Sequence, residues 1–168
     1  PGSILTPGGF ATMGFGPPAA IGAKIANPDR VVISLVGDGG FGQNPAMLAT
    51  AVERNLGIVW IVMNNNAFGT IAGLQKAHYG VTYGTVFPGN IGDNEMTPNY
   101  ADIAKAYGAN GIRISSAEEL LPALEASLKS NKPTVIDVAM INNPTPTTGH
   151  WNILDIYSPD SDVSHVST

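Results

Sequence analysis

The sequence predicts an α/β fold, in which a doubly wound parallel sheet carries helices on both faces. Three apolar runs of strand length, at 31–36, 58–63 and 134–140, are rich in β-branched residues. Because these runs are apolar on both sides, they fit strands that are buried on both faces, as in a parallel sheet. Segments with helical periodicity separate them, and this alternation is typical of doubly wound α/β layers.

Helix signals precede and follow the apolar runs. The predicted helices are 17–26, 46–54, 100–107 and 117–129. Asn44 and Pro45 fit an N-cap followed by proline at the first helical position. Ser116 and Glu119 fit a capping box, and Gly108 fits a helix stop. The first helical segment comes before the first apolar run, so we expect that a preceding strand of the sheet is missing from the chain.

Composition limits the class of protein and its partners. The 168 residues fit one domain, expected at 1–143, followed by an extended tail rich in Pro, Thr, Ser and Asp at 144–168. Only 12% of residues are charged, so we expect partner chains or a further domain to cover part of the surface. The net charge of -5 argues against nucleic acid, and no apolar run approaches the ~20 residues of a membrane span. The absence of cysteine excludes thiolate metal sites and fits a cytoplasmic location.

The segments that follow the first two apolar runs are the candidates for ligand binding, because parallel sheets bind ligands beyond the carboxyl ends of their strands. These segments are GDGGFG at 37–42 and NNNAFG at 64–69. The first matches the dinucleotide pattern G-x-G-x-x-G, but asparagines replace the expected acidic ribose ligand, and Asp38 would repel a pyrophosphate. A bridging Mg²⁺ would reverse that repulsion. We therefore favour a metal-bridged diphosphate over NAD, with ordinary turns as the alternative for each segment alone.

Two motifs resemble those of thiamine diphosphate-dependent enzymes. GDG at 37–39 and NN at 64–65 are separated by 24 residues, and GGFATMGFGPPAAIGA at 8–23 resembles the segment that precedes GDG in the acetohydroxyacid synthase and benzoylformate decarboxylase family. The similarity covers about residues 4–140. It implies the C-terminal, diphosphate-binding domain of a lyase or transferase that uses thiamine diphosphate and Mg²⁺. Such an acetolactate synthase-like carboligase or decarboxylase acts on a 2-oxo acid or a related carbonyl.

The resemblance also implies roles for individual residues. Asp38, the Asn65 side chain and the Ala67 carbonyl would bind Mg²⁺. Met13 would wedge between the two rings of the cofactor, although composition alone would place it in the hydrophobic core. The full set of expected cofactor-binding residues is Ala11, Thr12, Met13, Gly37, Asp38, Gly39, Gly40, Phe41, Asn65, Ala67, Phe68, Gly69 and Thr70.

Substrate contacts are expected on the helix that follows the second motif. Ile71, Leu74 and Gln75 would line the acyl pocket, although acetohydroxyacid synthases often have tryptophan in place of Leu74. The long segment 81–96 is expected to be a mobile lid.

The remaining expectations concern what completes the site. In the family, a glutamate of the pyrimidine-binding domain activates the cofactor, and no segment here resembles that domain. We therefore expect no catalytic residue in this chain, a pyrimidine-binding domain from the same or a neighbouring chain, and a homodimer or homotetramer. Two alternatives stay open: a separate small subunit of a two-subunit 2-oxo acid decarboxylase, and a non-catalytic nucleotide-binding module of Rossmann type.

Overall fold

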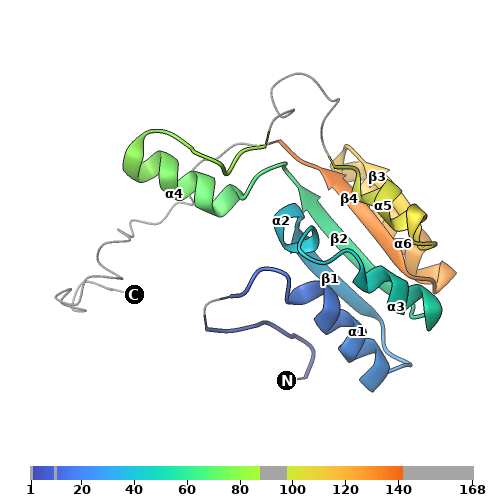
Figure 1. Cartoon of the computed structure of the whole chain (residues 1–168). Coiled ribbons are helices and arrows are strands. Elements are labelled where there is room, and N and C mark those ends of the chain that lie inside the picture. Colours follow the sequence, from blue (N-terminus) through green and yellow to red (C-terminus); the bar gives the residue numbers. More distant parts are fainter. Residues whose placement is uncertain (1, 10, 88–97, 142–168) are drawn as a thin grey trace.

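A four-stranded parallel sheet forms the centre of the computed structural model, which describes residues 2–9, 11–87 and 98–141. Its strand order is β1-β2-β4-β3 (Figure 1). The strands are β1 (Val32–Gly37), β2 (Ile58–Asn64), β3 (Asn110–Ile114) and β4 (Thr134–Ala139). The three predicted strands are therefore confirmed to within one residue at each end, whereas β3 was not predicted.

Six α-helices connect or flank the strands in the described part of the chain. They are α1 (Gly16–Ala26), α2 (Asp38–Phe41), α3 (Met47–Glu53), α4 (Gly69–Tyr79), α5 (Tyr100–Ala106) and α6 (Leu120–Ser130). The capping box is confirmed, since the Ser116 N–H donates to Glu119 Oε2 at 3.0 Å and opens a 3₁₀ turn, η2 (Ala117–Glu119), that leads into α6. The predicted stop after α5 is also confirmed, because Gly108 has φ of +86°.

The predicted start of α3 is wrong. Asn44 and Pro45 lie in tight turns ahead of the helix, where their carbonyls accept hydrogen bonds from the N–H groups of Met47 and Leu48, three residues on. The α-helix begins only at Met47. The predicted tail at 144–168 and residues 88–96 of the predicted lid lie outside the described residues.

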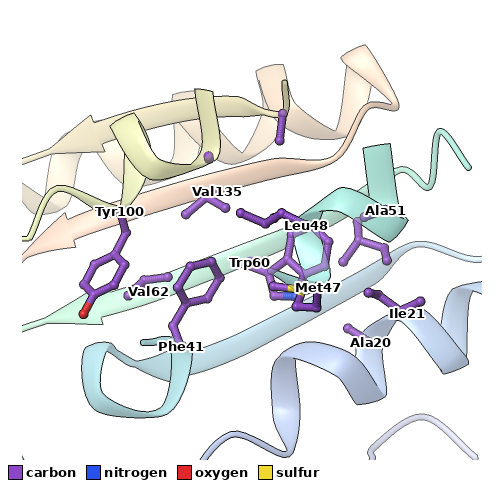
Figure 2. Close-up of a cluster of buried hydrophobic side chains, with 13 residues drawn as sticks. Ala20, Ile21, Phe41, Met47, Leu48, Ala51, Trp60, Val62, Tyr100 and Val135 are labelled. Atoms are coloured by element: carbon purple, nitrogen blue, oxygen red, sulfur yellow. The ribbon is translucent and has the colours of Figure 1, made fainter. Parts of the chain in front are cut away.

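The larger hydrophobic core lies between the sheet and helices α1, α2, α3 and α5 (Figure 2). Trp60 of β2 is at its centre, fully buried, and its indole N–H donates to the Pro17 carbonyl at the start of α1. Phe41 and Leu48 are also fully buried in this layer. Burial of each such side chain stabilises the fold by about 1.5–3 kcal/mol. This core therefore fixes β2 against the helices on one face of the sheet.

Helix α6 covers the other face over β2 and β4, which confirms helices on both sides of the sheet. Val59 and Ile136 of the strands pack there against Ala123 of α6. β1 is less covered on this face, since Ile33 is 44% exposed and Leu35 is 65% exposed. We call these two residues the exposed face of β1. Among the described residues, no helix has the length and apolarity needed to cross a membrane.

Candidate functional site

The two predicted binding segments lie side by side, because β1 and β2 are neighbouring parallel strands whose carboxyl ends are in register, with Gly37 opposite Met63. Asp38 is the first residue of α2, directly after β1. Asn65 and Ala67 follow β2 and precede α4. The sheet topology thus brings the expected Mg²⁺ ligands to one edge.

The side chains of Asp38 and Asn65 converge on one backbone N–H group. Asp38 is only 4% exposed, and its carboxylate accepts hydrogen bonds from the N–H of Gly39 at 2.9 Å and from the N–H of Ala67 at 3.2 Å. Asn65 Oδ1 accepts from the same Ala67 N–H at 3.3 Å. The three proposed ligand residues are therefore in mutual contact, with two side-chain oxygens directed to one point.

The Asp38 carboxylate lies in an environment that disfavours its charge. Burial raises the pKa of Asp38, while hydrogen bonds from backbone N–H groups, that of Gly39 first, oppose the rise. Within the described residues the ion pairs are Lys105–Asp102 and Arg113–Asp137, and neither involves Asp38. A bound cation would supply the missing counter-charge.

A second feature of the site also fits a cation. Asn66 lies between the two ligand residues in a left-handed conformation, with φ of +52°. Its buried Oδ1 has no hydrogen-bond partner in the structure. Asp38, Asn65 and Asn66 carry oxygen atoms of the carboxylate and amide types that Mg²⁺ prefers. Clusters of three or more His, Cys, Asp or Glu side chains do not occur in the described residues, so any metal here would depend on such a mixed oxygen set.

Three segments meet at Gly39. A Cβ atom on Gly39 would lie 2.6 Å from Cδ1 of Phe68 and 2.8 Å from Cε of Met13. Met13 comes from the loop before α1 and is 45% exposed, so the expectation from composition that it belongs to the core is wrong. Ala11, in the same loop, has φ of +50° and is exposed, as is Thr12. Expected cofactor residues from all three segments thus lie together.

The segment at 83–87 supports this site and was not predicted to do so. The Phe68 N–H donates to the Thr85 carbonyl at 2.8 Å, and the Phe87 N–H donates to the Asn66 carbonyl at 3.0 Å. The rings of Phe68 and Phe87 meet edge to face, with centroids 5.0 Å apart. These contacts hold the backbone on both sides of Ala67.

Helix α4 carries the residues expected to contact substrate and extends away from the sheet (Figure 1). Ile71 is 43% exposed on this helix, and Leu74 is partly exposed. The Gln75 side chain is occupied elsewhere, since its Oε1 accepts from the Tyr83 N–H and the Thr85 hydroxyl and its Nε2 donates to the Tyr83 carbonyl. In this structure Gln75 therefore ties α4 to the segment that supports the site.

The model of the family described as "Thiamine pyrophosphate enzyme, C-terminal TPP binding domain" matches residues 1–138. The chain belongs to this family. Thiamine pyrophosphate is another name for thiamine diphosphate, so the resemblance carried by GDG and NN is confirmed. The parallel sheet with helices is likewise the fold of a solved relative in this family.

Known relatives of this thiamine pyrophosphate-binding domain are much longer proteins. A "Probable acetolactate synthase large subunit" of Methanocaldococcus jannaschii is 38% identical over 140 residues, which are 83% of this chain and 23% of that protein. The 3D-(3,5/4)-trihydroxycyclohexane-1,2-dione hydrolase of Shouchella clausii is 36% identical over 149 residues, 86% of this chain and 23% of that protein. The domain thus spans about a quarter of the length of these relatives.

A solved structure of a much longer enzyme is also similar to this domain. The thiamine diphosphate-dependent 4-hydroxybenzoylformate decarboxylase of Rhodococcus jostii RHA1 superimposes with a TM-score of 0.69 at 33% identity. The match covers 79% of this chain and 24% of the decarboxylase chain. The family model describes a thiamine pyrophosphate enzyme, and this solved relative is thiamine diphosphate-dependent by its name.

Proposed function

We propose that this domain forms the diphosphate-binding half of the active site in a carboligase or decarboxylase that acts on a 2-oxo acid or a related carbonyl compound. The observation that carries the proposal is the convergence of Asp38 and Asn65 on the Ala67 N–H at the carboxyl ends of β1 and β2. The names of an acetolactate synthase and a benzoylformate-type decarboxylase among the relatives support this substrate class.

In this proposal Asp38, Asn65 and the Ala67 carbonyl hold Mg²⁺, which in turn holds the diphosphate. The carboxylate supplies a negative charge, the two other groups supply neutral oxygens, and phosphate oxygens and water complete the octahedron. Asp38 is already buried and fixed by backbone N–H groups, so little ordering is needed when the ion binds. Burial disfavours the charged form of the Asp38 carboxylate, and attraction to a bound divalent cation would offset this cost.

The backbone at the starts of α2 and α4 would surround the diphosphate. The N–H groups of Gly40 and Phe41 lie in the first turn of α2, where few intrahelical partners exist. The Gly39 N–H donates to Asp38 Oδ1, so Gly39 would contribute space for the diphosphate, because it has no side chain. Gly69 and Thr70 open α4 on the other side, and the Phe68 ring lies over Gly39. The Phe68 N–H is bonded to Thr85, so Phe68 would contribute its ring instead.

When bound, thiamine diphosphate would supply a nucleophilic carbon and, in its ring, an electron sink for chemistry at a substrate carbonyl. The residues of this domain bind and orient that group. Met13 would support its folded shape, the Ala11 carbonyl would accept a hydrogen bond from its amino group, and Ile71 and Leu74 would exclude water beside the substrate. The activating glutamate would come from a pyrimidine-binding domain of the same or a neighbouring chain, within a homodimer or homotetramer.

The proposal is tested by calorimetry on the full-length protein, with thiamine diphosphate titrated in the presence and absence of Mg²⁺ and with NAD titrated in parallel. We expect binding of thiamine diphosphate that requires Mg²⁺, and no binding of NAD. Asp38→Ala should abolish this binding while the circular dichroism spectrum is kept. The matched control is Asp29→Ala, because Asp29 is an exposed aspartate in the turn that precedes β1, whereas Asp38 follows the other end of this strand. Binding of NAD, or normal Mg²⁺-dependent binding by Asp38→Ala, would contradict the proposal.

A further inference from the structure

A buried polar network lies next to the proposed metal site, with Asp137 at its centre. Asp137 is fully buried in β4. Its carboxylate accepts hydrogen bonds from Asn64 Nδ2 at 3.0 Å, from the Tyr100 N–H at 2.9 Å and from Arg113 Nη1 at 2.8 Å. These partners come from β2, α5 and β3. One carboxylate thus joins three other elements of the fold.

The first connection to the site is Asn64, the last residue of β2. Its Nδ2 also donates to the Pro98 carbonyl at 3.0 Å, and its Oδ1 accepts from the Asn66 N–H at 3.3 Å. Both donors and the acceptor of this amide are in use, so the orientation of the side chain is fixed. Asn65, a proposed Mg²⁺ ligand, is the next residue. Asp137 therefore fixes the last residue of β2, directly before the loop that carries Asn65.

The second connection is Tyr100, the first residue of α5. Its backbone N–H is bound to Asp137, and its hydroxyl donates to the Asp38 carbonyl at 3.2 Å. The ring packs edge to face against Phe41 of α2, with centroids 5.4 Å apart (Figure 2). Tyr100 therefore links Asp137 to the segment that carries the other Mg²⁺ ligand, Asp38.

Stability alone does not account for a carboxylate at position 137. Removing a charge from water is costly, and a buried ion pair can often be replaced by apolar residues without loss of stability. Its neighbours in β4, Val135 and Ile136, are fully buried apolar residues. An apolar side chain could continue that pattern at 137. What an apolar side chain could not do is fix Asn64 and Tyr100 at the same time.

We propose that Asp137 is a positioning residue of the metal and diphosphate site, which acts through Asn64 and Tyr100 on the two segments that carry the Mg²⁺ ligands. The proposal rests on the function proposed above. Residues that orient metal ligands through hydrogen bonds typically change metal affinity by 10–100-fold when they are replaced. Asp137 touches neither metal nor cofactor in this role.

The first test is Asp137→Asn in the full-length protein. An amide at this position places its NH₂ group against a donor in either orientation, because Asn64 Nδ2 faces one oxygen of Asp137 and the Tyr100 N–H and Arg113 Nη1 face the other. Calorimetry with thiamine diphosphate at increasing Mg²⁺ should show that about 10–100-fold more Mg²⁺ is needed for half-maximal binding. Ile136→Ala is the matched control: it is in the same strand, fully buried, and packs on the opposite face, so it should lower stability and leave the Mg²⁺ requirement within about twofold of wild type.

The second test exchanges the charge within the pair. Asn64→Asp alone sets two carboxylates against each other and should also raise the Mg²⁺ requirement. In the double variant Asn64→Asp, Asp137→Asn, the amide of residue 137 can donate to the carboxylate of residue 64. This variant should recover part of the lost Mg²⁺ affinity if the hydrogen bond between residues 64 and 137 is what positions the loop, although the Pro98 carbonyl loses its donor in both variants that carry Asn64→Asp. No recovery in a folded double variant would contradict the proposal.

Tyr100→Phe tests the other connection, and it removes only one hydroxyl group. We expect a severalfold rise in the Mg²⁺ requirement, with the fold retained. A normal Mg²⁺ requirement in Tyr100→Phe, or in a folded Asp137→Asn, overturns the positioning role. If Asp38→Ala also left binding unchanged, the metal site itself would be wrong. Loss of binding in Asp38→Ala with normal binding in these variants would reject only the role of Asp137.

Discussion

Replacing Gly39 with alanine should separate cofactor binding from folding. Gly39 lies within α2 and is not among the glycines with positive φ, so alanine suits its backbone and favours the helix by about 1 kcal/mol. The added Cβ would lie 2.6 Å from Phe68 Cδ1 and 2.8 Å from Met13 Cε. The Met13 methyl group is the end of a flexible, exposed side chain, while Phe68 is held by Phe87, so overpacking of about 1–3 kcal/mol is expected. The net loss of stability should be about 0–2 kcal/mol.

Gly39→Ala should weaken cofactor binding much more than it lowers the stability of the fold. Gly39 lies at the proposed diphosphate site, and the new methyl group would displace the side chains of Phe68 and Met13, which lie next to it. We expect the Kd of thiamine diphosphate at saturating Mg²⁺ to rise at least about 100-fold, which corresponds to about 2.7 kcal/mol. Calorimetry on the full-length protein gives the Kd, and urea unfolding gives the change in stability.

Gly22→Ala is the matched control. Gly22 lies on the outer side of α1, and nothing lies within 4 Å of the position that its Cβ would take. This variant should gain about 0.5–1 kcal/mol of stability and bind the cofactor normally. The reasoning is refuted if Gly39→Ala binds as wild type, or if it loses more than about 3 kcal/mol of stability while its affinity is kept.

Three further predictions follow from burial and charge. Met13 is 45% exposed, so Met13→Ala should lose less than about 1 kcal/mol in urea unfolding while the turnover of the full-length enzyme falls markedly; a large stability loss with normal turnover would contradict its role. Burial raises the pKa of Asp38, so its ionisation opposes folding above the usual aspartate pKa, and Asp38→Asn should remove the fall in the urea midpoint of the metal-free protein that this ionisation causes as the pH rises; an unchanged pH dependence in the variant would contradict the prediction. Burial, with the charges of Asp38 and Asp137, raises the pKa of Tyr100 to about 12. Its contribution to stability should therefore be complete below pH 10 and lost as the pH rises towards 12, and Tyr100→Phe should flatten this decline in unfolding experiments at stepped pH.

The strands and most helices were predictable because each is specified by a local pattern. The strand β3 was not, since Asn110, Gly111 and Arg113 give it little apolar character. Its place depends on distant contacts. A Cβ on Gly111 would overlap the Ala101 carbonyl of α5, so only glycine allows this close approach, and Arg113 pairs with Asp137 of β4. Neither relation can be read from the local sequence.

The same distinction holds for the site. Asp38, Asn65 and Ala67 could be proposed from sequence because they directly follow strands that a parallel sheet brings together. Asn64 and Asp137 are 73 residues apart, and Tyr100 and Asp38 are 62 apart, so their contacts depend on the folded arrangement of the sheet. Gln75 was expected to meet substrate because of its place on α4. The structure shows its hydrogen bonds to the segment at 83–85, which no pattern in the sequence had associated with it.

The exposed face of β1 has a practical consequence for anyone who wishes to use this domain as a free-standing cofactor module. β1 is the edge strand of the described sheet, and an edge strand with apolar side chains is a template for pairing between molecules. Ile33 and Leu35 are already 44% and 65% exposed, so lysine or glutamate at these positions removes little packing. Charged substitutions there would discourage association between molecules at high concentration. The other face of β1 would still pack against the larger core, and the segment after its carboxyl end would still carry Asp38.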